Sequence, residues 1–515
     1  MKTIRYFLTF FSFIILIHVS LNAQDSLLHQ RISLPDTVCT VESALRIIEN
    51  NTGLSFSYNS GLINKKQIIS LRAEDEELVE VLGRTLNEPD LSFSIIGRHL
   101  VIYRPIRTLS ASAENRTDSV FYFEIRGVVR DKSDKQPIPY SSVYLAGKTI
   151  GTISNDAGQF VLKLSSKYLS DTLNISSIGY KNFMVPVSSL VNTSKEYLLK
   201  SDFVSIQEVI IRKLSPVTLL QSAVERIRDN YSPKPVLLNS FYRETVKRGN
   251  RYLIVSEALL ENYKPGYGNS QAQDQIKIVK GRKSEAPDHG DTLMLKLKAG
   301  LNTMILLDLV KNVPDFMTGD QVQDYSYKMA DIVIDNGIDN YAIEFRPKEM
   351  ALNTFYSGRI LLGVKDLAFK WIEFGIDPER LDRATELFIV RKPPYLKIKV
   401  LKANYHVAFR QIGSRYYLHL IQCETEFRIR NRQQLTGTVY NTSLEMAVTD
   451  VDSVNADRFR SRETARLYDF FTEQVGEYDE SFWGEYNIIT PDESLEEALV
   501  KLGKLQATKK DENME

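Results

Sequence analysis

Histidine often carries metal-binding or acid–base chemistry, and this chain has few histidines. After the first 23 residues they are His29, His99, His289, His406 and His419. A catalytic zinc site needs three protein ligands and an open fourth position for water. No histidine here stands in an H-E-x-x-H or H-x-x-E pattern. The sequence therefore predicts no zinc site, and we expect no metal or other cofactor.

Other catalytic patterns are also missing from the sequence. The chain has no G-x-S-x-G turn and no glycine loop that would cradle a phosphate. His406 and His419 fall on strands predicted to be neighbours, where a hydrogen-bonded sheet histidine is more common than a pair of metal ligands. Residues 450–457 space acidic side chains as a calcium loop does, but they lack its glycine and distal glutamate, which favours a solvated loop. We predict that the protein is not an enzyme.

Basic residues gather in one part of the chain. Residues 391–432 hold 10 basic and 2 acidic residues, and residues 450–515 hold 8 basic and 17 acidic residues. Successive side chains of a strand point to opposite faces of the sheet, so residues two positions apart lie on the same face. We therefore predict a surface for an anionic ligand or a partner, made of Lys397, Lys399, Arg428, Arg430 and Arg432. The alternative is a solvated outer face covered by the acidic C-terminus.

Length and composition describe a globular, mainly β protein. The chain has 515 residues, enough for roughly three domains. Its 65 basic and 65 acidic residues cancel, which argues against nucleic acid as a partner. The 26 tyrosines and 24 phenylalanines favour strands.

The first 23 residues predict export. Lys2 and Arg5 precede a short apolar run, and Ala23 precedes a polar start, as in a cleaved signal peptide. The apolar run is short for a membrane span. We expect a mature chain from Gln24 in the periplasm or on the periplasmic face of the outer membrane, attached to the membrane at most peripherally. Cys39 and Cys423 fall in different predicted domains and are expected to be buried or idle thiols.

Residues 30–105 predict a small α/β module. Thr40 is a plausible N-cap for a helix that ends near Gly53, and a second helix is predicted over residues 76–86. Similar strands follow the two helices, Gly53-Leu-Ser-Phe-Ser-Tyr and Asp90-Leu-Ser-Phe-Ser-Ile. The segment resembles the short N-terminal domain shared by secretins and TonB-dependent receptors. That resemblance implies docking to envelope proteins, among them the TonB-dependent transport machinery, although a ferredoxin-like module of another function stays open.

A linker over residues 106–122 leads to a predicted β-sandwich over residues 123–200. Turn residues at 155–158 predict a hairpin, and Gly179 predicts a bulge or a close backbone approach. The runs G-V-V-x-D, P-I-P-Y-S-S-V and L-x-I-S-S-I-G-Y resemble the carboxypeptidase regulatory-like domain. That resemblance implies a transthyretin-like β-sandwich in an envelope protein of the Bacteroidetes type, without peptidase activity.

After a linker with a short strand over residues 201–214, residues 215–505 predict an α+β domain with a large antiparallel sheet. A helix begins at Ser215-Pro216, and alternating strands follow, separated by a polar loop over residues 265–291. The run Tyr341-Ala-Ile-Glu-Phe-Arg-Pro and the strands after it resemble periplasmic lipoprotein carriers, whose half-barrel sheet holds lipid chains.

A last helix is predicted from a capping box at residues 490–493 to about Lys504. Its apolar stripe should dock on the sheet, with its acids near the basic strands, and comprises Leu495, Ala498, Leu499 and Leu502. Residues 506–515 are expected to form a disordered tail.

Three functions are open at this point. The first is a non-enzymatic envelope protein that acts through docking and binding modules. The second is a periplasmic carrier or chaperone for hydrophobic or lipidated ligands, and the third is a hydrolase whose site the sequence does not reveal. A deep apolar pocket would favour the carrier, clustered carboxylates with shifted pKa values would favour the enzyme, and flat exposed edges would favour docking.

Overall fold

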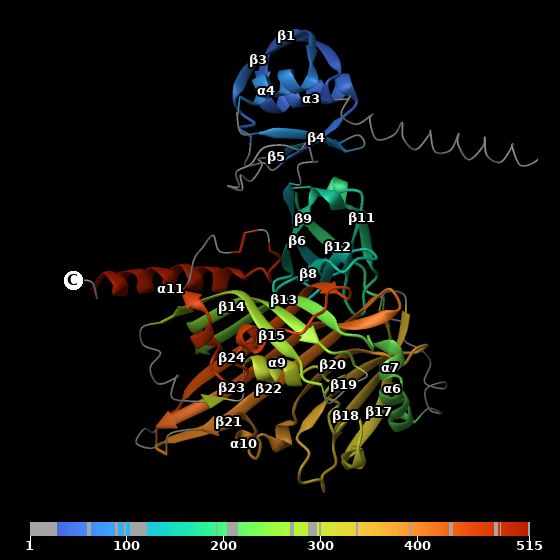
Figure 1. The fold of residues 1–515 in the computed structure, drawn as a ribbon, viewed down its shortest axis with the longest axis vertical. Helices are drawn as coiled ribbons and strands as arrows, with labels where there is room; N and C mark the ends of the chain where they lie inside the picture. The colour runs from blue at the N-terminus through green and yellow to red at the C-terminus, as the bar shows by residue number, and fades with distance from the viewer. Residues whose placement is uncertain are drawn as a thin grey trace, which may run out of the picture. The chain divides into compact units, whose positions relative to one another are not determined.

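The structure is a computed structural model, and the residues that it describes are mainly β, with 49% of them in strands and 20% in helices (Figure 1). It describes residues 28–58, 63–87, 91–96, 99–103, 121–191, 193–202, 215–267, 272–286, 296–297, 300–335, 338–391, 394–431, 436–477, 483–484 and 486–512. The predicted signal peptide and most of the linker over residues 106–122 lie outside these residues. Among the described residues, no helix combines the length and apolar composition needed to cross a membrane.

The described chain separates into two compact units. The first holds the residues up to Gly127 with Lys163–Leu173 and Val185–Lys195, and the second holds Val128–Leu162, Asn174–Met184 and the residues from Glu196 onward. This division follows compactness and cuts through the sandwich. The predicted domain boundaries therefore stay predictions.

The N-terminal module of the first unit is the predicted α/β arrangement. Its elements are β1 (Arg31–Thr40), α3 (Val41–Thr52), β2 (Ser55–Tyr58), β3 (Ile68–Glu77), α4 (Leu78–Leu86), β4 (Ser92–Ile96) and β5 (His99–Tyr103). β1 pairs with β3, and β5 lies between β2 and β4. Thr40 Oγ1 caps α3 by accepting the backbone N–H of Ser43, and Gly53 ends the helix with a φ of 69°, as predicted.

The sandwich has seven strands in two sheets, ordered β11-β10-β7-β8 and β12-β6-β9. They are β6 (Tyr122–Asp131), β7 (Ser142–Leu145), β8 (Gly151–Ile153), β9 (Gln159–Ser165), β10 (Thr172–Ser176), β11 (Phe183–Pro186) and β12 (Ser194–Leu199). This confirms the predicted β-sandwich.

The predicted turn at residues 155–158 is present. Asn155 Oδ1 accepts the backbone N–H groups of Ala157 and Gln159. Gly158 has a φ of 73°, and a Cβ there would lie 2.4 Å from the carbonyl oxygen of Val129, so only glycine fits. Gly179, with a φ of 81°, makes the predicted close approach by donating its N–H to the Ile334 carbonyl at 3.2 Å.

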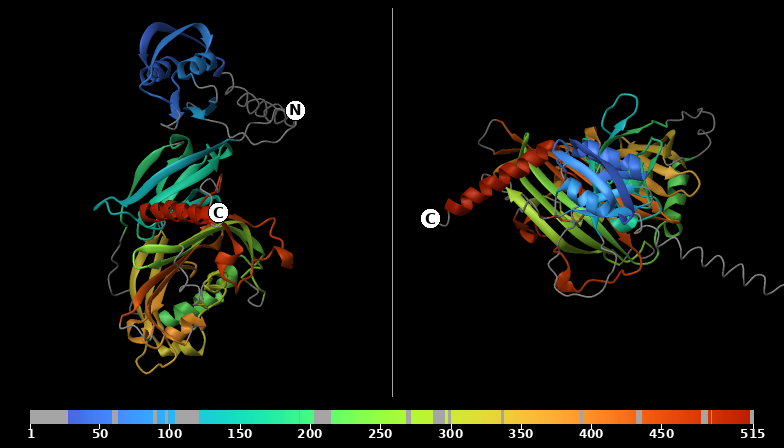
Figure 2. Two further views of the ribbon diagram at one scale, coloured as in Figure 1. Left: turned by 90° about the vertical axis from the view of Figure 1, so that its left-hand side faces the viewer. Right: turned by 90° about the horizontal axis from the view of Figure 1, so that it is seen from above.

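The second unit is built on an eleven-stranded sheet, ordered β17-β18-β19-β20-β22-β23-β24-β13-β14-β15-β25 (Figures 1 and 2). The strands are β13 (Val236–Arg248), β14 (Arg251–Lys264), β15 (Gln275–Glu285), β17 (Tyr325–Asp335), β18 (Ile338–Pro347), β19 (Tyr356–Gly363), β20 (Phe369–Ile376), β22 (Leu396–Ile412), β23 (Arg415–Asn431), β24 (Thr438–Asp452) and β25 (Gly476–Glu477). β16 (Lys296–Leu297) and β21 (Ile389–Arg391) form a separate pair. The sheet confirms the predicted large antiparallel architecture.

One predicted loop is wrong over part of its length. Residues 275–285 form β15 instead, which pairs with β14 along most of its length. Ile276 is buried, but the lysines and Gly281 of this segment interrupt the alternation of apolar and polar residues that would predict a strand. Gly281 is required because Val475 would lie 2.4 Å from a Cβ at that position.

One face of the sheet carries the main hydrophobic core. Helices pack into it: α6 (Pro216–Glu225), α7 (Ile227–Asn230), α9 (Leu301–Leu306) and α10 (Thr385–Phe388). Leu220 of α6 and Met304 of α9 are buried there among strand residues such as Phe374. Side chains of the strands and helices pack together on this face, whereas the carrier resemblance implies a hollow for lipid. Short 3-10 helices complete the structure at Ser166–Tyr168, Val187–Ser189, Asp320–Asp324, Pro378–Arg380, Ser461–Glu463 and Phe471–Gln474.

The last helix, α11 (Glu493–Glu512), docks on the sheet as predicted. Leu495, Leu499 and Leu502 are buried against Leu253 of β14, and Ala498 is partly buried beside them. Two details of the prediction are wrong. Asp492 caps the helix by accepting the N–H of Leu495 at 2.7 Å, in place of a box begun by Thr490. The helix also continues through residues expected to form a tail, because residues 504–512 are mostly good helix formers.

Candidate functional site

The face of the sheet opposite the main core carries a line of polar side chains that crosses ten strands. We call it the cross-strand row. In register from β17 to β15 its members are Lys328, Glu344, Arg359, Glu373, His406, Gln422, Glu445, Arg243, Glu257 and Arg282. Cations and carboxylates alternate along most of the row. Side chains directly opposite on adjacent strands interact, so each cation has a carboxylate as a neighbour there. His406 and Gln422 interrupt the alternation of charge.

The β13–β15 end of the row is buried and fully paired. Arg243 Nε lies 2.8 Å from Glu257 Oε1, and Arg282 Nη2 lies 2.8 Å from Glu257 Oε2. Burial raises the pKa of Glu257, but the two guanidinium groups outweigh burial and hold this pKa below its usual range. Arg243 also donates to the Ile489 carbonyl at 2.7 Å, in the segment that leads to α11. This end is a structural network.

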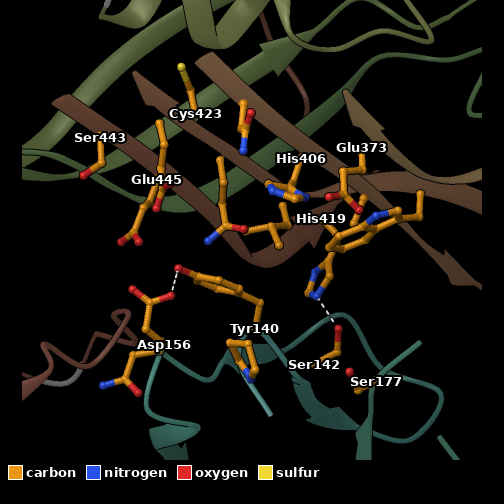
Figure 3. A pocket seen from close by; sticks show the side chains of 18 of the residues that line it. Tyr140, Ser142, Asp156, Ser177, Glu373, His406, His419, Cys423, Ser443 and Glu445 are labelled. Carbon is orange, nitrogen blue, oxygen red and sulfur yellow. Dashed lines mark hydrogen bonds between the residues drawn. The ribbon is translucent and has the colours of Figure 1, made fainter. Parts of the chain in front are cut away.

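Toward β20 the row becomes the floor of a cavity of about 1460 Å³ (Figure 3). The opposite wall comes from residues 137–144, 155–156 and 176–182 of the sandwich, which belong to the same compact unit. The cavity is lined by six basic residues, Arg243, Lys247, Arg359, Lys370, Lys402 and Arg410, and six acidic ones, Asp156, Glu373, Glu424, Glu426, Glu445 and Asp492. The charges of the lining therefore balance.

One corner of the pocket gathers carboxyl groups around Tyr140 (Figure 3). Tyr140 has a φ of 55°, which is rare for a bulky residue and is found most often where function constrains the backbone. Its hydroxyl donates to Asp156 Oδ1. Burial raises the pKa of Asp156, and it raises the pKa of Glu445 despite the nearby Arg243. Both carboxyls therefore hold a proton to a higher pH than usual.

A serine–histidine pair lies across the pocket from these acids. Ser142 Oγ and His419 Nε2 are 2.7 Å apart, the spacing of a nucleophile and its base. In such pairs a carboxylate stabilises the imidazolium ion. Here burial and the positive charge of Arg410 instead lower the pKa of His419 to about 3. His419 is therefore a poor base, and the bond joins the sandwich to β23.

Three nitrogen atoms in the pocket have no hydrogen-bond partner among the described residues. They are Arg359 Nε, His406 Nδ1 and Arg410 Nη1. The rest of the Arg410 guanidinium is held in place, because Nη2 donates to the Thr149 carbonyl at 2.6 Å and the group lies over the ring of Tyr144. Burial lowers the pKa of His406 despite Glu373 on the next strand. A buried polar atom without a hydrogen-bond partner costs about 1–3 kcal/mol, so a ligand that forms hydrogen bonds with these three nitrogen atoms would be stabilised in the pocket.

The Cys423 side chain packs against the main core, on the other face of β23 from Gln422, and it is not activated. Burial, reinforced by Glu424 and Glu244, raises the pKa of its thiol to about 12, and a thiolate is needed for attack. Cys39 and Cys423 are both free thiols, as predicted. Within the described ranges no cluster of histidine, cysteine, aspartate or glutamate could hold a metal ion.

The structure brings the predicted basic residues together on β22 and β23. Lys397 lies opposite Arg430, and Lys399 lies opposite Arg428. Lys399 Nζ is 2.7 Å from Asp382, so its partner is not an acid of the C-terminal segment. Arg432 lies outside the described residues. The role of this surface in binding stays a prediction.

Sequence reasoning missed most of the pocket. The pattern of turn residues identifies Asp156 only as part of a hairpin, and nothing local marks Tyr140 or Glu445. The prediction that His406 and His419 lie on neighbouring strands is confirmed by the β22–β23 pairing. His419 is hydrogen-bonded as expected, whereas His406 Nδ1 is not.

Residues 125–211 match the family described as the CarboxypepD_reg-like domain. This segment is a CarboxypepD_reg-like domain. The match confirms the resemblance predicted for the sandwich. The secretin and TonB-receptor likeness of the N-terminal module, and the Bacteroidetes type, stay predictions. No curated protein matches the chain.

Solved structures that resemble parts of the chain include the following three. A DUF1329 family protein from Desulfovibrio piger is 12% identical over 47% of this chain and 96% of its own, with a TM-score of 0.20. Lipovitellin is 11% identical over 47% of this chain and 28% of its own, with a TM-score of 0.23. A membrane-associated protein of unknown function from Bacteroides fragilis is 10% identical over 64% of this chain and 99% of its own, with a TM-score of 0.13. Scores this low support no inference.

Proposed function

We propose that this is an exported, non-catalytic envelope protein that binds a polar ligand in the pocket between its CarboxypepD_reg-like domain and its large sheet. One observation carries the proposal: the cross-strand row is paired at its β13–β15 end, but in the pocket two of its buried nitrogen atoms, Arg359 Nε and His406 Nδ1, have no hydrogen-bond partner among the described residues. Buried polar atoms in proteins rarely lack a hydrogen-bond partner. Ligand oxygens would satisfy them.

The reactive groups in and beside the pocket support binding over catalysis. His419 has a pKa of about 3, and Cys423 has a pKa of about 12. A general base works best with a pKa near the pH of the reaction, and a cysteine nucleophile needs a low pKa. Neither residue meets its requirement.

Docking to other envelope proteins is the second part of the proposal. The N-terminal module and the basic surface of Lys397, Lys399, Arg428 and Arg430 are its candidate contacts. Lys397 lies opposite Arg430 and Lys399 opposite Arg428, so this surface concentrates positive charge that suits an acidic partner. The TonB-dependent transport machinery is the partner class implied by the N-terminal resemblance, and membrane attachment would be peripheral.

Recovery of a bound small molecule tests the proposal. Protein purified natively from the envelope fraction is denatured, and the released small molecules are identified by mass spectrometry. The variant Asn404→Trp places a bulky ring in the pocket, because Asn404 lines it, and Glu344→Trp is the matched control on an exposed position of the row outside the lining. We expect a polar molecule from the native protein and from the control but not from Asn404→Trp. Equal recovery from all three, or none from any, would contradict the proposal.

A hydrolase is the second candidate, favoured by Asp156 and Glu445. Their raised pKa values and their place in one corner are features of a carboxyl pair that performs acid–base chemistry. Nitrophenyl glycosides and esters test this candidate. Turnover that Asp156→Asn abolishes would establish the hydrolase, and no turnover above heat-denatured protein is expected from a binding protein.

A further inference from the structure

The pocket floor presents one polar side chain per strand over five consecutive strands. They are Arg359 on β19, Glu373 on β20, His406 on β22, Gln422 on β23 and Glu445 on β24. Adjacent strands lie about 4.8 Å apart, so these side chains repeat at roughly the length of one sugar ring. Guanidinium groups only donate, carboxylates accept, and the amide and imidazole do both. The floor therefore matches a ligand that carries many donors and acceptors at a regular spacing.

Backbone groups cannot take part in recognition at this floor. β19, β20, β22, β23 and β24 are each paired on both sides, so their N–H and C=O groups are used within the sheet. An extended peptide that binds by adding a strand needs a free sheet edge. Recognition here rests on side chains alone, which disfavours a peptide strand and suits a ligand with its own polar groups around a ring.

Charge in the pocket favours a neutral ligand. Six basic and six acidic residues line it, so no strong net field selects an anion or a cation. Three nitrogen atoms without a hydrogen-bond partner can bond to hydroxyl groups of a ligand. They are Arg359 Nε, His406 Nδ1 and Arg410 Nη1. Sugar hydroxyls can accept from the guanidinium groups and donate to Glu373 at the same time.

An aromatic ring stands beside the polar row. Trp371 is half-buried and precedes Glu373 by two positions on β20, so both side chains lie on the pocket face. Its ring centroid is 5.7 Å from that of His406. An aromatic face beside hydrogen-bonding groups suits the apolar C–H face of a pyranose ring.

We propose that the pocket segment of the cross-strand row binds a neutral oligosaccharide, which lies across the strands with Trp371 against one of its rings. This inference rests on the proposed function and specifies the class of ligand. Successive sugar units would lie above successive strands, with their hydroxyls bonded to the side chains from Arg359 to Glu445.

The probe is an array of neutral glycans followed by calorimetry with the hexasaccharides that bind, using the full mature chain. Glu373→Gln keeps the shape of an exposed side chain but removes its charge, and Trp371→Ala removes the ring. Glu344→Gln is the matched control, because Glu344 belongs to the same row outside the pocket lining. Losing a hydrogen bond to a charged group should weaken binding about tenfold in Glu373→Gln. The control should bind as the unmodified protein does.

Each outcome decides between the possibilities. Binding of a neutral glycan that Glu373→Gln and Trp371→Ala weaken, in variants that melt with one cooperative transition, supports the proposal. Absence of any neutral glycan, binding only to sulfated or uronic glycans, or equal effects of Glu373→Gln and Glu344→Gln would overturn it. A peptide or phosphorylated molecule recovered from the native protein would overturn the oligosaccharide alone. An empty native pocket would overturn the proposed function as well.

Discussion

At the scale of residues, the pocket combines strong hydrogen-bonding groups with suppressed nucleophiles. Arg410 illustrates both effects. Its guanidinium is fixed by Thr149 and Tyr144 and keeps Nη1 available, while its charge helps to lower the pKa of His419. A binding site needs such fixed donors, whereas acyl-transfer chemistry would need a carboxylate where Arg410 stands.

Glu244 gives a pH-dependent test at this scale. It lies on the core face of β13, where burial raises its pKa to about 7, and Tyr242 donates to it. In the unfolded chain the carboxyl titrates near 4.5, so between pH 4.5 and 7 the folded protein binds more protons and its stability falls as pH rises. We expect Glu244→Gln to remove about 2 kcal/mol of that fall between pH 5 and pH 8, measured by urea unfolding at each pH. Parallel stability profiles for the two proteins would contradict the assignment.

Arg243 tests the paired end of the row. Arg243→Met leaves Glu257 and Glu445 without their shared cation, and Arg243 and Glu257 are almost fully buried. Breaking a buried pair in this way costs about 3–5 kcal/mol in the free energy of unfolding. Lys402→Met is the control, because its pair with Glu424 is exposed and should be worth less than about 1 kcal/mol. Equal losses in the two variants would show that the row has no structural role.

At the scale of elements, the sequence predicts what depends on neighbouring residues and misses what depends on register. The cap at Thr40 and the stripe of Leu495, Leu499 and Leu502 are local patterns, and both are confirmed. The cross-strand row is not local, because it depends on how far each strand slides past the next. A bulge between Val400 and Lys402 shifts that register, and no sequence signal marks it. The pocket therefore cannot be predicted from the sequence. The pairing of the two strands that carry His406 and His419 can be predicted, because it depends only on their order in the chain.

The docking of α11 has a direct test in its leucines. Leu499 is 4% exposed in a cluster with Leu253 and Tyr252, and Leu499→Ala should lower the free energy of unfolding by about 2–5 kcal/mol. Val500 is 42% exposed on the same helix, and Val500→Ala should change it by less than about 0.5 kcal/mol. Urea denaturation measures both. If truncation before α11 left the stability unchanged, the helix would be a displaceable lid and our account of it would be wrong.

At the scale of the whole molecule, we propose a signal peptide, then an N-terminal module that docks, then a sandwich and a sheet that together form the binding pocket. Cleavage after Ala23 is the first requirement of that arrangement. We expect N-terminal sequencing of the protein from envelope fractions to return Gln24 as the first residue. An intact Met1 in that fraction would contradict export by a cleaved signal.

Binding without turnover is the central claim, and one measurement tests it most directly. Small molecules recovered from the native protein are incubated with an equimolar amount of freshly purified protein and followed by mass spectrometry over hours. We predict that their masses and amounts stay constant while the complex persists. A steady conversion to products, abolished by Asp156→Asn, would show that the carboxyl groups around Tyr140 form a catalytic site.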